Sequence, residues 1–343
     1  MTRSAMLASF WFCLWAFALS ACSPRPELVQ TRLSGATMGT SYNISIVAER
    51  APKDVEALQR DIDALLQDIN QAMSTYIPDS ELNRLNGVET GQWQAVSAPL
   101  MEVLAISESV SQLSKGAFDV TLRPLIDLWG FGPDPAKDRV PSDGEIAAAS
   151  VNVGYQNLEL NQGRVRRHKP INVDLSAVAK GYGVDRVAQL LEAGGYHNYL
   201  VEIGGEIRLK GVSRRGTPWR IAVETPSAGL TQTVQRAIEL SDMAMATSGD
   251  YRNYFERNGV RYSHTIDPRT GRPITHHLAS VTVLDKSAAR ADALATAFSV
   301  LGLEQALPLA NGEGIPALFI IRQGATFEEV ASDTFKPYLA NGP

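Results

Sequence analysis

The segment between Ser241 and Gly302 contains the residues of this sequence that are best suited to chemistry. An apolar run is expected to end in a small-residue turn at residues 247–249, and a helix is expected further along. Asp292 and Thr296 are four residues apart on that helix, so their side chains lie on one face. Both offer hard oxygen ligands, and His264 lies on a nearby loop. This combination indicates a Mg²⁺-assisted reaction on phosphate.

The pattern alone leaves two interpretations of Asp292 and Thr296 open. The helix, expected to start at about Ser287, is rich in alanine, and both polar side chains could simply face solvent. Alternatively the apolar helix is buried, and a buried carboxylate must be paired or bound to a metal. The role of His264 is likewise undecided between catalytic and structural, since a single histidine is commonly a structural residue. No HExxH spacing accompanies it, so zinc is not expected.

A second candidate is the segment 174–183, where a short strand (171–175) is expected to run into a helix. Lys180 and the backbone amides of this turn could hold an anion. The segment has neither the order of a Walker A loop nor the Gly-x-Gly-x-x-Gly dinucleotide pattern. Other conspicuous residues are interpreted as structural, the glycine pair as a β-bulge and the rings as packing groups. They are Gly204, Gly205, Trp129, Phe131, His276 and His277.

The first 22 residues resemble a bacterial export signal. Arg3 is followed by a mostly apolar run over residues 6–19, which is too short to span a bilayer comfortably. The run ends in Leu-Ser-Ala-Cys, which is similar to a lipoprotein signal in which Cys22 is lipidated and becomes the mature N-terminus. An ordinary cleaved signal and an uncleaved anchor are the alternatives.

Cysteine content and charge exclude several classes of function. Of the two cysteines, Cys13 would leave with the signal and Cys22 would carry lipid, so the mature domain would have no thiol. Disulfides, zinc–thiolate sites and cysteine catalysis are then excluded. The formal net charge is −5 and there is no long basic run, so we expect no nucleic-acid partner.

Three regions follow from these observations: a lipoprotein signal peptide at 1–21, a lipidated polar tether at 22–34, and a single large catalytic domain at 35–343. A turn at residues 35–40 would open that domain. Strands outnumber helices, and few strand–helix–strand units repeat in order. This favours an α+β fold, an antiparallel-rich sheet sandwich with helices packed on the outer faces. The clearest elements expected are helices at 54–73, 78–85 and 99–113, a helix ending at 194–195, a hairpin at 158–165 and a strand at 278–284.

Taken in order, the short motifs of the chain resemble those of the ApbE family of FAD:protein FMN transferases. The resemblance spans about residues 35–301 and rests on the combination, because each motif alone is weak. The motifs are Met38-Gly-Thr40, Ala117-Phe-Asp-Val-Thr121, Asp174-Leu-Ser-Ala-Val-Ala-Lys-Gly181, Val201-Glu-Ile-Gly-Gly205, Thr247-Ser-Gly249, His264-Thr-Ile-Asp-Pro268 and Asp292-Ala-Leu-Ala-Thr296.

The resemblance implies a role for individual residues. FAD would be bound as the substrate, with Mg²⁺ at its pyrophosphate. The implied metal ligands are the side chains of Asp292 and Thr296 and a backbone oxygen of Ala177. His264 would assist the acceptor hydroxyl as the catalytic residue. The implied flavin-binding residues are Met38, Tyr76, Ala117, Phe118, Asp119, Asp174, Lys180 and Ile266.

The resemblance also implies a reaction, partners and a location. The enzyme would transfer the FMN moiety of FAD to a threonine hydroxyl of a target protein and release AMP. Expected acceptors are subunits of the sodium-pumping NADH:quinone oxidoreductase (Nqr) and of Rnf-type complexes, with a sequence similar to Asp-Gly-x-Ser-Gly-Ala-Thr. The protein would be a lipoprotein on the periplasmic side of a bacterial membrane. Two rivals stay open: a Mg²⁺-dependent FAD pyrophosphatase that gives FMN and AMP, and a non-catalytic FAD-binding lipoprotein.

Overall fold

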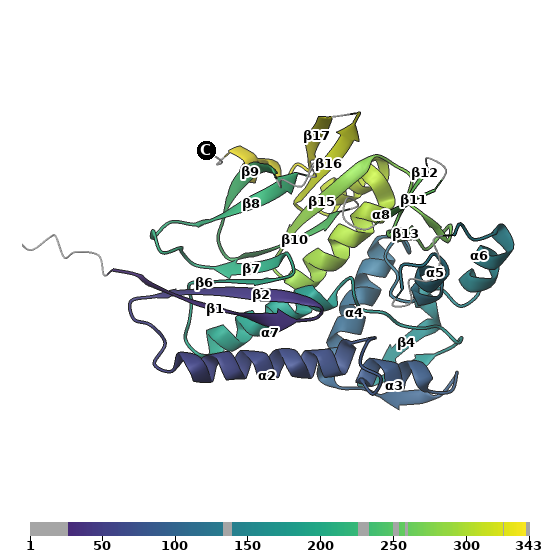
Figure 1. The fold of residues 1–343 in the computed structure, drawn as a ribbon, viewed down its shortest axis with the longest axis horizontal. Coiled ribbons are helices and arrows are strands. Elements are labelled where there is room, and N and C mark those ends of the chain that lie inside the picture. Colours follow the sequence, from purple (N-terminus) through teal and green to yellow (C-terminus); the bar gives the residue numbers. More distant parts are fainter. Residues whose placement is uncertain are drawn as a thin grey trace, which may run out of the picture.

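An eight-stranded antiparallel sheet forms the centre of the fold (Figure 1). The computed structural model describes residues 27–132, 139–225, 233–249, 254–257, 260–324 and 326–340. Every neighbouring pair in the sheet is antiparallel, which confirms the expected α+β class with an antiparallel-rich sheet. In spatial order the strands are β1 (Val29–Thr37), β2 (Thr40–Ala48), β6 (Tyr199–Ile203), β7 (Glu206–Lys210), β10 (Met243–Gly249), β15 (Leu278–Asp285), β16 (Ala317–Gln323) and β17 (Thr326–Ala331).

The central strands are buried on both faces of the sheet. Along β10, Ala244 and Ala246 pack into the main core, whereas Met245 packs into a second core on the other face. This alternation is the two-residue period of a strand. In β15 every residue from 278 to 284 is buried, which explains why the sequence there is mostly apolar and interrupted only by the small polar residues Ser280 and Thr282.

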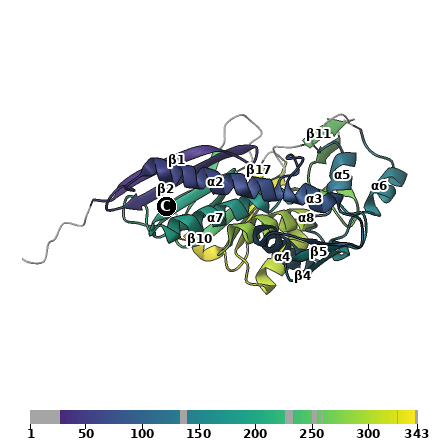
Figure 2. The ribbon, with the colours of Figure 1, turned by 90° about the horizontal axis from the view of Figure 1, so that it is seen from below.

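Helices cover one face of the sheet. They are α2 (Val55–Met73), α7 (Ala179–Ala193) and α8 (Ala288–Gly312), and they lie side by side when the molecule is seen from below (Figure 2). The Asp54 side chain caps α2 by accepting from the Ala57 amide at 2.8 Å. Leu58, Ile62 and Leu66 fall at helical spacing and are buried against the sheet.

Helix α8 crosses the middle of the molecule and is the helix expected from Ser287, whose side chain caps it. It is long and apolar enough to pass for a membrane span, but most of its residues are buried inside the protein. Its composition is therefore that of a core helix. Gly302 has non-helical φ and ψ of 70° and 168°, so two helical segments meet there at a kink.

The opposite face of the sheet is covered by a hairpin. Strands β8 (Trp219–Thr225) and β9 (Thr233–Leu240) lie over it together with α9 (Lys336–Ala340) (Figure 1). Trp219 and Ile238 pack there with Met245, forming the second core. The fold is thus a sandwich, with helices on one side of the large sheet and a β-hairpin on the other.

The remaining elements gather at one end of the molecule. Trp129 organises a small third core with Ile266, and its indole nitrogen donates to the Gly271 carbonyl oxygen at 2.8 Å. Trp129 is therefore a core residue, as expected. The elements here are α3 (Glu81–Gly87), β3 (Trp93–Ala95), α4 (Ala98–Leu113), α5 (Arg123–Leu128), α6 (Asp143–Ser150), η1 (Tyr155–Asn157), β4 (Leu158–Asn161), β5 (Arg164–Arg167), β11 (Tyr254–Arg257), β12 (Val260–Ser263), β13 (Ile266–Asp267) and β14 (Arg272–Pro273).

The structure corrects four local expectations. Strand β1 begins at Val29, so the tether expected at 22–34 is too long, and residues 35–37 belong to a strand because they pair with β2. Residues 247–249 end β10 rather than forming a turn, since they pair with β15. Segment 171–175 makes only a single bridge, between Leu122 and Asn172, and is not a strand. The signal peptide and Cys22 lie outside the described residues.

Candidate active site

One cavity of about 770 Å³ opens beside the N-terminal half of α8 and lies in the size range of ligand sites. Seven separate segments of the chain contribute to its wall: residues 117–126, 174–180, 202–207, 222, 245–249, 264–266 and 292–300. Most of the residues implied by the sequence line it: Ala117, Phe118, Asp119, Asp174, Ala177, Lys180, His264, Ile266, Asp292 and Thr296. The structure thus brings together residues that are up to 179 positions apart in the chain, from Ala117 to Thr296.

Close packing of α7 on α8 positions Asp292. Gly181 lies so near α8 that a Cβ atom there would fall 2.7 Å from the Ala289 Cα. Its amide donates to Asp292 Oδ2 at 3.2 Å. Only glycine permits this approach, so the small residue after Lys180 connects the two helices at the site.

Asp185 of α7 fixes the first turn of α8. Its buried carboxylate accepts hydrogen bonds from Ser287 Oγ at 2.7 Å and from the amides of Ala288 and Ala289 at 3.0 and 3.1 Å. Arg208 of β7 donates to the same carboxylate at 2.7 Å. A negative charge at a helix N-terminus is favourable, and here it joins α7, α8 and the sheet one turn before Asp292.

The most unusual electrostatic feature of the cavity is a buried cluster of two carboxylates and one lysine. Lys180 Nζ lies 2.7 Å from Glu206 Oε2 and 3.9 Å from Asp292 Oδ2. Glu206 is 3% exposed and Asp292 is 6% exposed. Oε2 of Glu206 makes no hydrogen bond of acceptable geometry among the described residues, although Lys180 is close to it. The cluster carries one more negative than positive charge when all three groups are ionised.

Burial and mutual repulsion perturb these groups. Burial raises the pKa of Glu206 to about 8, and the charge of Asp292 adds to the shift. Burial likewise raises the pKa of Asp292 above its ordinary value, although Lys180 opposes this. For Lys180, burial lowers the pKa, but the two carboxylates outweigh it and leave the pKa raised. The lysine is therefore held in its charged form beside carboxylates that lack full compensation.

The donors near this cluster suit a hard divalent cation. Thr296 is one helical turn beyond Asp292 and lines the same cavity, as Ala177 does. No group of three or more His, Cys, Asp or Glu side chains occurs within the described ranges, so a metal site there must include other donors. A carboxylate, a hydroxyl and a backbone carbonyl match Mg²⁺, which retains water or phosphate in its remaining positions. The two buried carboxylates with raised pKa values, which a single lysine does not fully compensate, are a second property that fits a cation.

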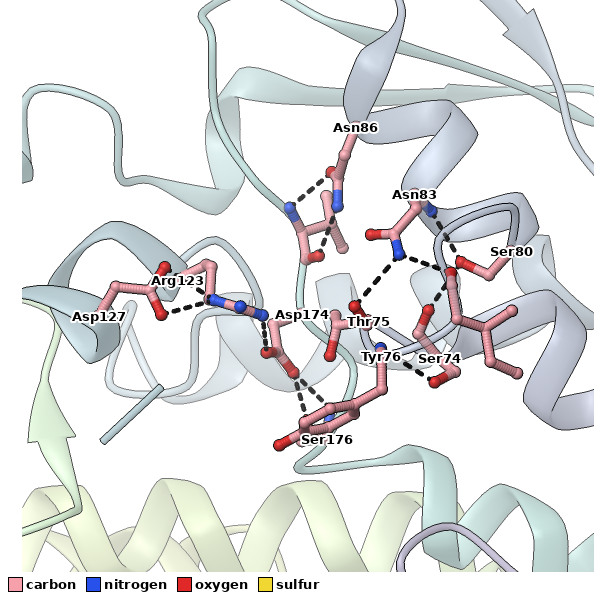
Figure 3. Close-up of polar contacts among 12 residues, drawn as sticks. Ser74, Thr75, Tyr76, Ser80, Asn83, Asn86, Arg123, Asp127, Asp174 and Ser176 are labelled. Atoms are coloured by element: carbon pink, nitrogen blue, oxygen red, sulfur yellow. Dashed lines mark hydrogen bonds and ion pairs between the residues drawn. The ribbon is translucent and has the colours of Figure 1, made fainter. Parts of the chain in front are cut away.

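The wall near Asp174 is held by ion pairs and backbone bonds. Asp174 Oδ2 accepts from Arg123 at 3.4 Å (Figure 3). The backbone amide of Asp174 donates to the Val120 carbonyl oxygen at 2.7 Å. Arg123 also donates to Asp127 at 2.8 Å. Arg123 thereby restrains the Asp174 carboxylate while remaining partly exposed itself.

Asp119 shapes its own loop. Its carboxylate accepts from the Thr121 amide at 2.8 Å, the Thr121 hydroxyl at 2.6 Å and the Tyr155 amide at 2.8 Å. Burial raises its pKa, although these hydrogen bonds oppose the shift. The side chain therefore holds in place the segment that begins at Ala117 and lines the cavity.

His264 lies between β12 and β13, on the wall of the cavity. The adjacent Ser263 hydroxyl accepts from the Thr265 amide at 3.0 Å, which shapes the loop. The His264 ring meets Phe131 edge-on at a centroid distance of 6.4 Å. Its position on the same cavity as the charged cluster favours the functional interpretation over the structural one.

Two residues implied by the sequence do not line the cavity. Met38 occupies the β1–β2 turn with φ of 50°, and its side chain packs against the main core. Tyr76 lies on the loop after α2 and is 74% exposed. In the view of Figure 3 its side chain extends toward the turn that contains Asp174 and Ser176, both of which line the cavity.

Sequence reasoning missed Glu206 because it misassigned the glycine pair before it. Gly204 and Gly205 form the two-residue turn of the β6–β7 hairpin, with φ of 58° and 106°, and are not a bulge. A Cβ on Gly204 would lie 3.2 Å from Lys180 Cδ, so the turn packs directly on the lysine stem. A Gly-Gly hairpin signal between two apolar segments was available in the sequence and would have placed Glu206 at the start of the second strand.

Comparison with known proteins gives a consistent result. The sequence model described as the ApbE family matches residues 38–319. A Vibrio cholerae protein named FAD:protein FMN transferase is 48% identical over 323 residues, covering 94% of this chain and 96% of the relative. An Escherichia coli K12 protein of the same name is 36% identical over 351 residues, covering 99% and 98%.

Solved structures agree with this result. The structure of the flavin transferase ApbE from Vibrio cholerae has a TM-score of 0.85 and 47% identity, covering 91% of this chain and all (100%) of that one. The apo form of the Pseudomonas stutzeri flavinyl transferase ApbE has a TM-score of 0.85 and 41% identity, covering 92% and 98%.

Proposed function

Since the chain belongs to the ApbE family, we propose that it is an FAD:protein FMN transferase. It transfers the FMN moiety of FAD to a hydroxyl of a target protein. The observation that carries the proposal is the buried cluster of Lys180, Glu206 and Asp292 beside Thr296 in a cavity of about 770 Å³. A charged site of this kind suits a pyrophosphate substrate, whose oxygens repel an incoming nucleophile unless their charge is neutralised.

The reaction is a displacement at phosphorus. The threonine oxygen of the acceptor bonds to the phosphorus of the FMN half, and the bond from that phosphorus to the bridging oxygen breaks. The electron pair leaves with AMP, and the hydroxyl proton passes to a base. His264, on the wall of the same cavity, is the base that we assign. Lys180 stabilises the charge that develops on the phosphate oxygens.

Mg²⁺ is the cation that we assign to the cluster. The side chains of Asp292 and Thr296 and the carbonyl of Ala177 would hold it, in agreement with the donor chemistry described above. When bound, the cation supplies Lewis-acid neutralisation of pyrophosphate charge. Gly181 and Asp185 contribute indirectly, because they fix the turn of α8 from which Asp292 extends.

We assign the flavin half of FAD to the side of the cavity formed by residues 117–119, Asp174 and Ile266. Tyr76, at 74% exposure, offers a free aromatic face near this side. Met38 would act only by supporting the wall, since its side chain packs in the core.

We further propose that Cys22 is lipidated and that the domain faces the periplasm. Only six residues separate Cys22 from Val29, where β1 begins, counting positions 23–28. Six extended residues span at most roughly 20 Å, so the domain would stay close to the membrane surface. That distance suits acceptors in membrane-bound redox complexes of the Nqr and Rnf type. If Cys22→Ser does not shift the protein from the membrane fraction to the soluble periplasmic fraction, the anchor is excluded.

Two variants test the proposed roles in the chemistry. His264→Ala should lower the rate of FMN transfer by about 10²–10⁴-fold, the usual contribution of a general base, and leave FAD affinity nearly unchanged. Asp292→Ala should abolish transfer at every Mg²⁺ concentration, because a metal ligand is lost. The matched controls are the exposed residues His197 and Asp333, whose alanine variants should behave as wild type. Equal losses of rate and of FAD affinity in His264→Ala would indicate a binding role instead.

The rival pyrophosphatase uses the same site with water in place of threonine. It is distinguished by its products, because FMN and AMP would appear in solution while the acceptor stays unmodified. The non-catalytic rival predicts intact FAD throughout. Its weakness is that His264, Asp292 and Thr296 all line one cavity with the charged cluster, which flavin storage alone does not require.

A further inference from the structure

Helix α3 carries two asparagines that reach in different directions toward the site. Asn83 and Asn86 are three residues apart and therefore neighbours on the helix surface. Both side-chain amides form hydrogen bonds with backbone groups of other segments (Figure 3). Neither residue lines the cavity, and none of the roles assigned above uses them.

Asn83 holds the loop that carries Tyr76. Its Nδ2 donates to the carbonyl oxygens of Thr75 at 3.1 Å and Ile77 at 2.8 Å, the two residues that flank Tyr76. Within the loop, the Tyr76 amide donates to Ser74 Oγ at 3.1 Å. The backbone is therefore tied down on both sides of Tyr76 while the ring is 74% exposed.

Asn86 holds the segment that carries Asp174. Its Nδ2 donates to the Val173 carbonyl at 2.9 Å, and the Val173 amide donates back to Asn86 Oδ1 at 2.8 Å. This paired bond is what a neighbouring β-strand would supply, although segment 171–175 is not a strand. On its other side the segment is tied to the Val120 carbonyl through the Asp174 amide at 2.7 Å.

We infer that Asn83 and Asn86 are positioning residues that set the separation between the Tyr76 ring and the Asp174 turn. This inference rests on the proposed function, because it assigns the flavin ring system of FAD to the space between the Tyr76 ring and the Asp174 turn. Aromatic rings prefer offset-stacked or edge-to-face arrangements with centroids about 4.5–7 Å apart, so the contribution of Tyr76 to flavin binding depends on where its ring is held. Helix α3 sets that position, since one rigid turn carries both amides.

Asparagine is needed at both positions for a chemical reason. A carboxylate of the same shape can accept hydrogen bonds but has no proton to donate. Asn83→Asp therefore points oxygens at two carbonyl oxygens, and Asn86→Asp keeps the bond from the Val173 amide but loses the bond to the Val173 carbonyl. Each substitution changes few atoms, removes the donor function and adds one negative charge.

The test is a double-mutant cycle in the full-length protein. FAD affinity is the measured quantity, and flavin fluorescence is the readout. Asn83→Asp should weaken FAD binding about tenfold, the size expected when one or two hydrogen bonds are lost, with kcat nearly unchanged. In a Tyr76→Ala background the same substitution should have no further effect, because Asn83 acts through Tyr76. Asn86→Asp should weaken binding in both backgrounds, because it acts through Asp174.

The controls separate positioning from general destabilisation. Asn311→Asp makes the same chemical change on the exposed end of α8 and should bind FAD as wild type does. Asn83→Ala also removes the hydrogen bonds to the Thr75 and Ile77 carbonyl oxygens but adds no charge. It replaces Asn83→Asp in the cycle if the aspartate variant does not fold. Full additivity of the Asn83 and Tyr76 substitutions would refute the inference, as would unchanged FAD affinity in the Asn83 variants. Failure of the wild type to bind FAD would overturn the proposed function along with it.

Discussion

Gly181→Ala is the change whose consequence can be worked most directly from the structure. A Cβ at this position would lie 2.5 Å from the Ala288 carbonyl carbon and 2.7 Å from the Ala289 Cα, both backbone atoms of α8. Ordinary contact begins at 3.4 Å, so the first turn of α8 would have to retreat by about 1 Å. Backbone atoms in a capped helix cannot rotate away as a side-chain end can.

The expected loss of stability is moderate. Overpacking of this kind costs about 1–3 kcal/mol, and the upper end applies because the retreat also stretches the bonds from Asp185 to the amides of Ala288 and Ala289. Replacing glycine by alanine inside a helix returns about 1 kcal/mol. The net cost of about 2 kcal/mol corresponds to a fall in Tm of roughly 4–8 °C for a domain of this size.

The expected loss of activity is larger than the loss of stability suggests. Asp292 lies one helical turn beyond Ala288 and receives its hydrogen bond from the Gly181 amide. A displacement of about 1 Å at a catalytic group costs roughly 10²-fold in rate. We therefore expect Gly181→Ala to lower kcat/KM for FMN transfer about 100-fold, with a higher requirement for Mg²⁺.

Thermal melts and steady-state transfer rates test this, with Gly183→Ala as the matched control. Gly183 lies on the same helix, but its Cβ would meet only side-chain ends, Met38 Cε at 3.0 Å and Ile203 Cδ1 at 3.2 Å. These can move by a few tenths of an ångström, so the control should keep the Mg²⁺ requirement of the wild type. If Gly181→Ala has the Tm and rate of Gly183→Ala, the proposed coupling of α7 to Asp292 is wrong.

Two further predictions concern the buried charges. Glu206 has a pKa of about 8 in the folded protein against 4.5 unfolded, so the proton it binds favours folding below pH 4.5, and this contribution is lost as pH rises toward 8. Metal-free protein should lose Tm across that window more steeply than Glu206→Gln, and parallel curves would refute the assignment. Asp185→Asn removes the nearer carboxylate from Arg208, which keeps only Glu192 at 3.8 Å, and should cost about 3 kcal/mol, measured by denaturant unfolding. An unchanged unfolding midpoint would show that the cap is not needed.

Local elements were predictable from local pattern. The period of Leu58, Ile62 and Leu66 predicts α2, and the hairpin β4–β5 follows from its turn at residues 161–163. The expected end of α7 near residue 194 is confirmed, as is the start of α8 at Ser287. In these cases the residues that decide the structure are within a few positions of one another.

Contacts between distant segments were not predictable in this way. The approach of Gly181 to α8 joins residues more than 100 positions apart, as the Gly181–Asp292 bond shows. Residues 247–249 consist of small side chains, which suggest a turn, but pairing with β15 makes them a strand. The side-chain amide of Asn86 replaces a strand partner for Val173, and no periodicity signals such a bond. The residues of the site were found through their resemblance to a family, whereas their geometry required the fold.

The central claim is that this protein moves FMN from FAD onto another protein. The most direct measurement is intact-mass spectrometry of a purified acceptor domain with the threonine motif, after incubation with the full-length protein, FAD and Mg²⁺, with AMP assayed in parallel. We expect the acceptor to gain one FMN moiety and AMP to appear in equal amount, and both to be lost when Mg²⁺ is chelated. An unmodified acceptor, under conditions in which the Vibrio cholerae relative labels the same acceptor, would contradict the claim.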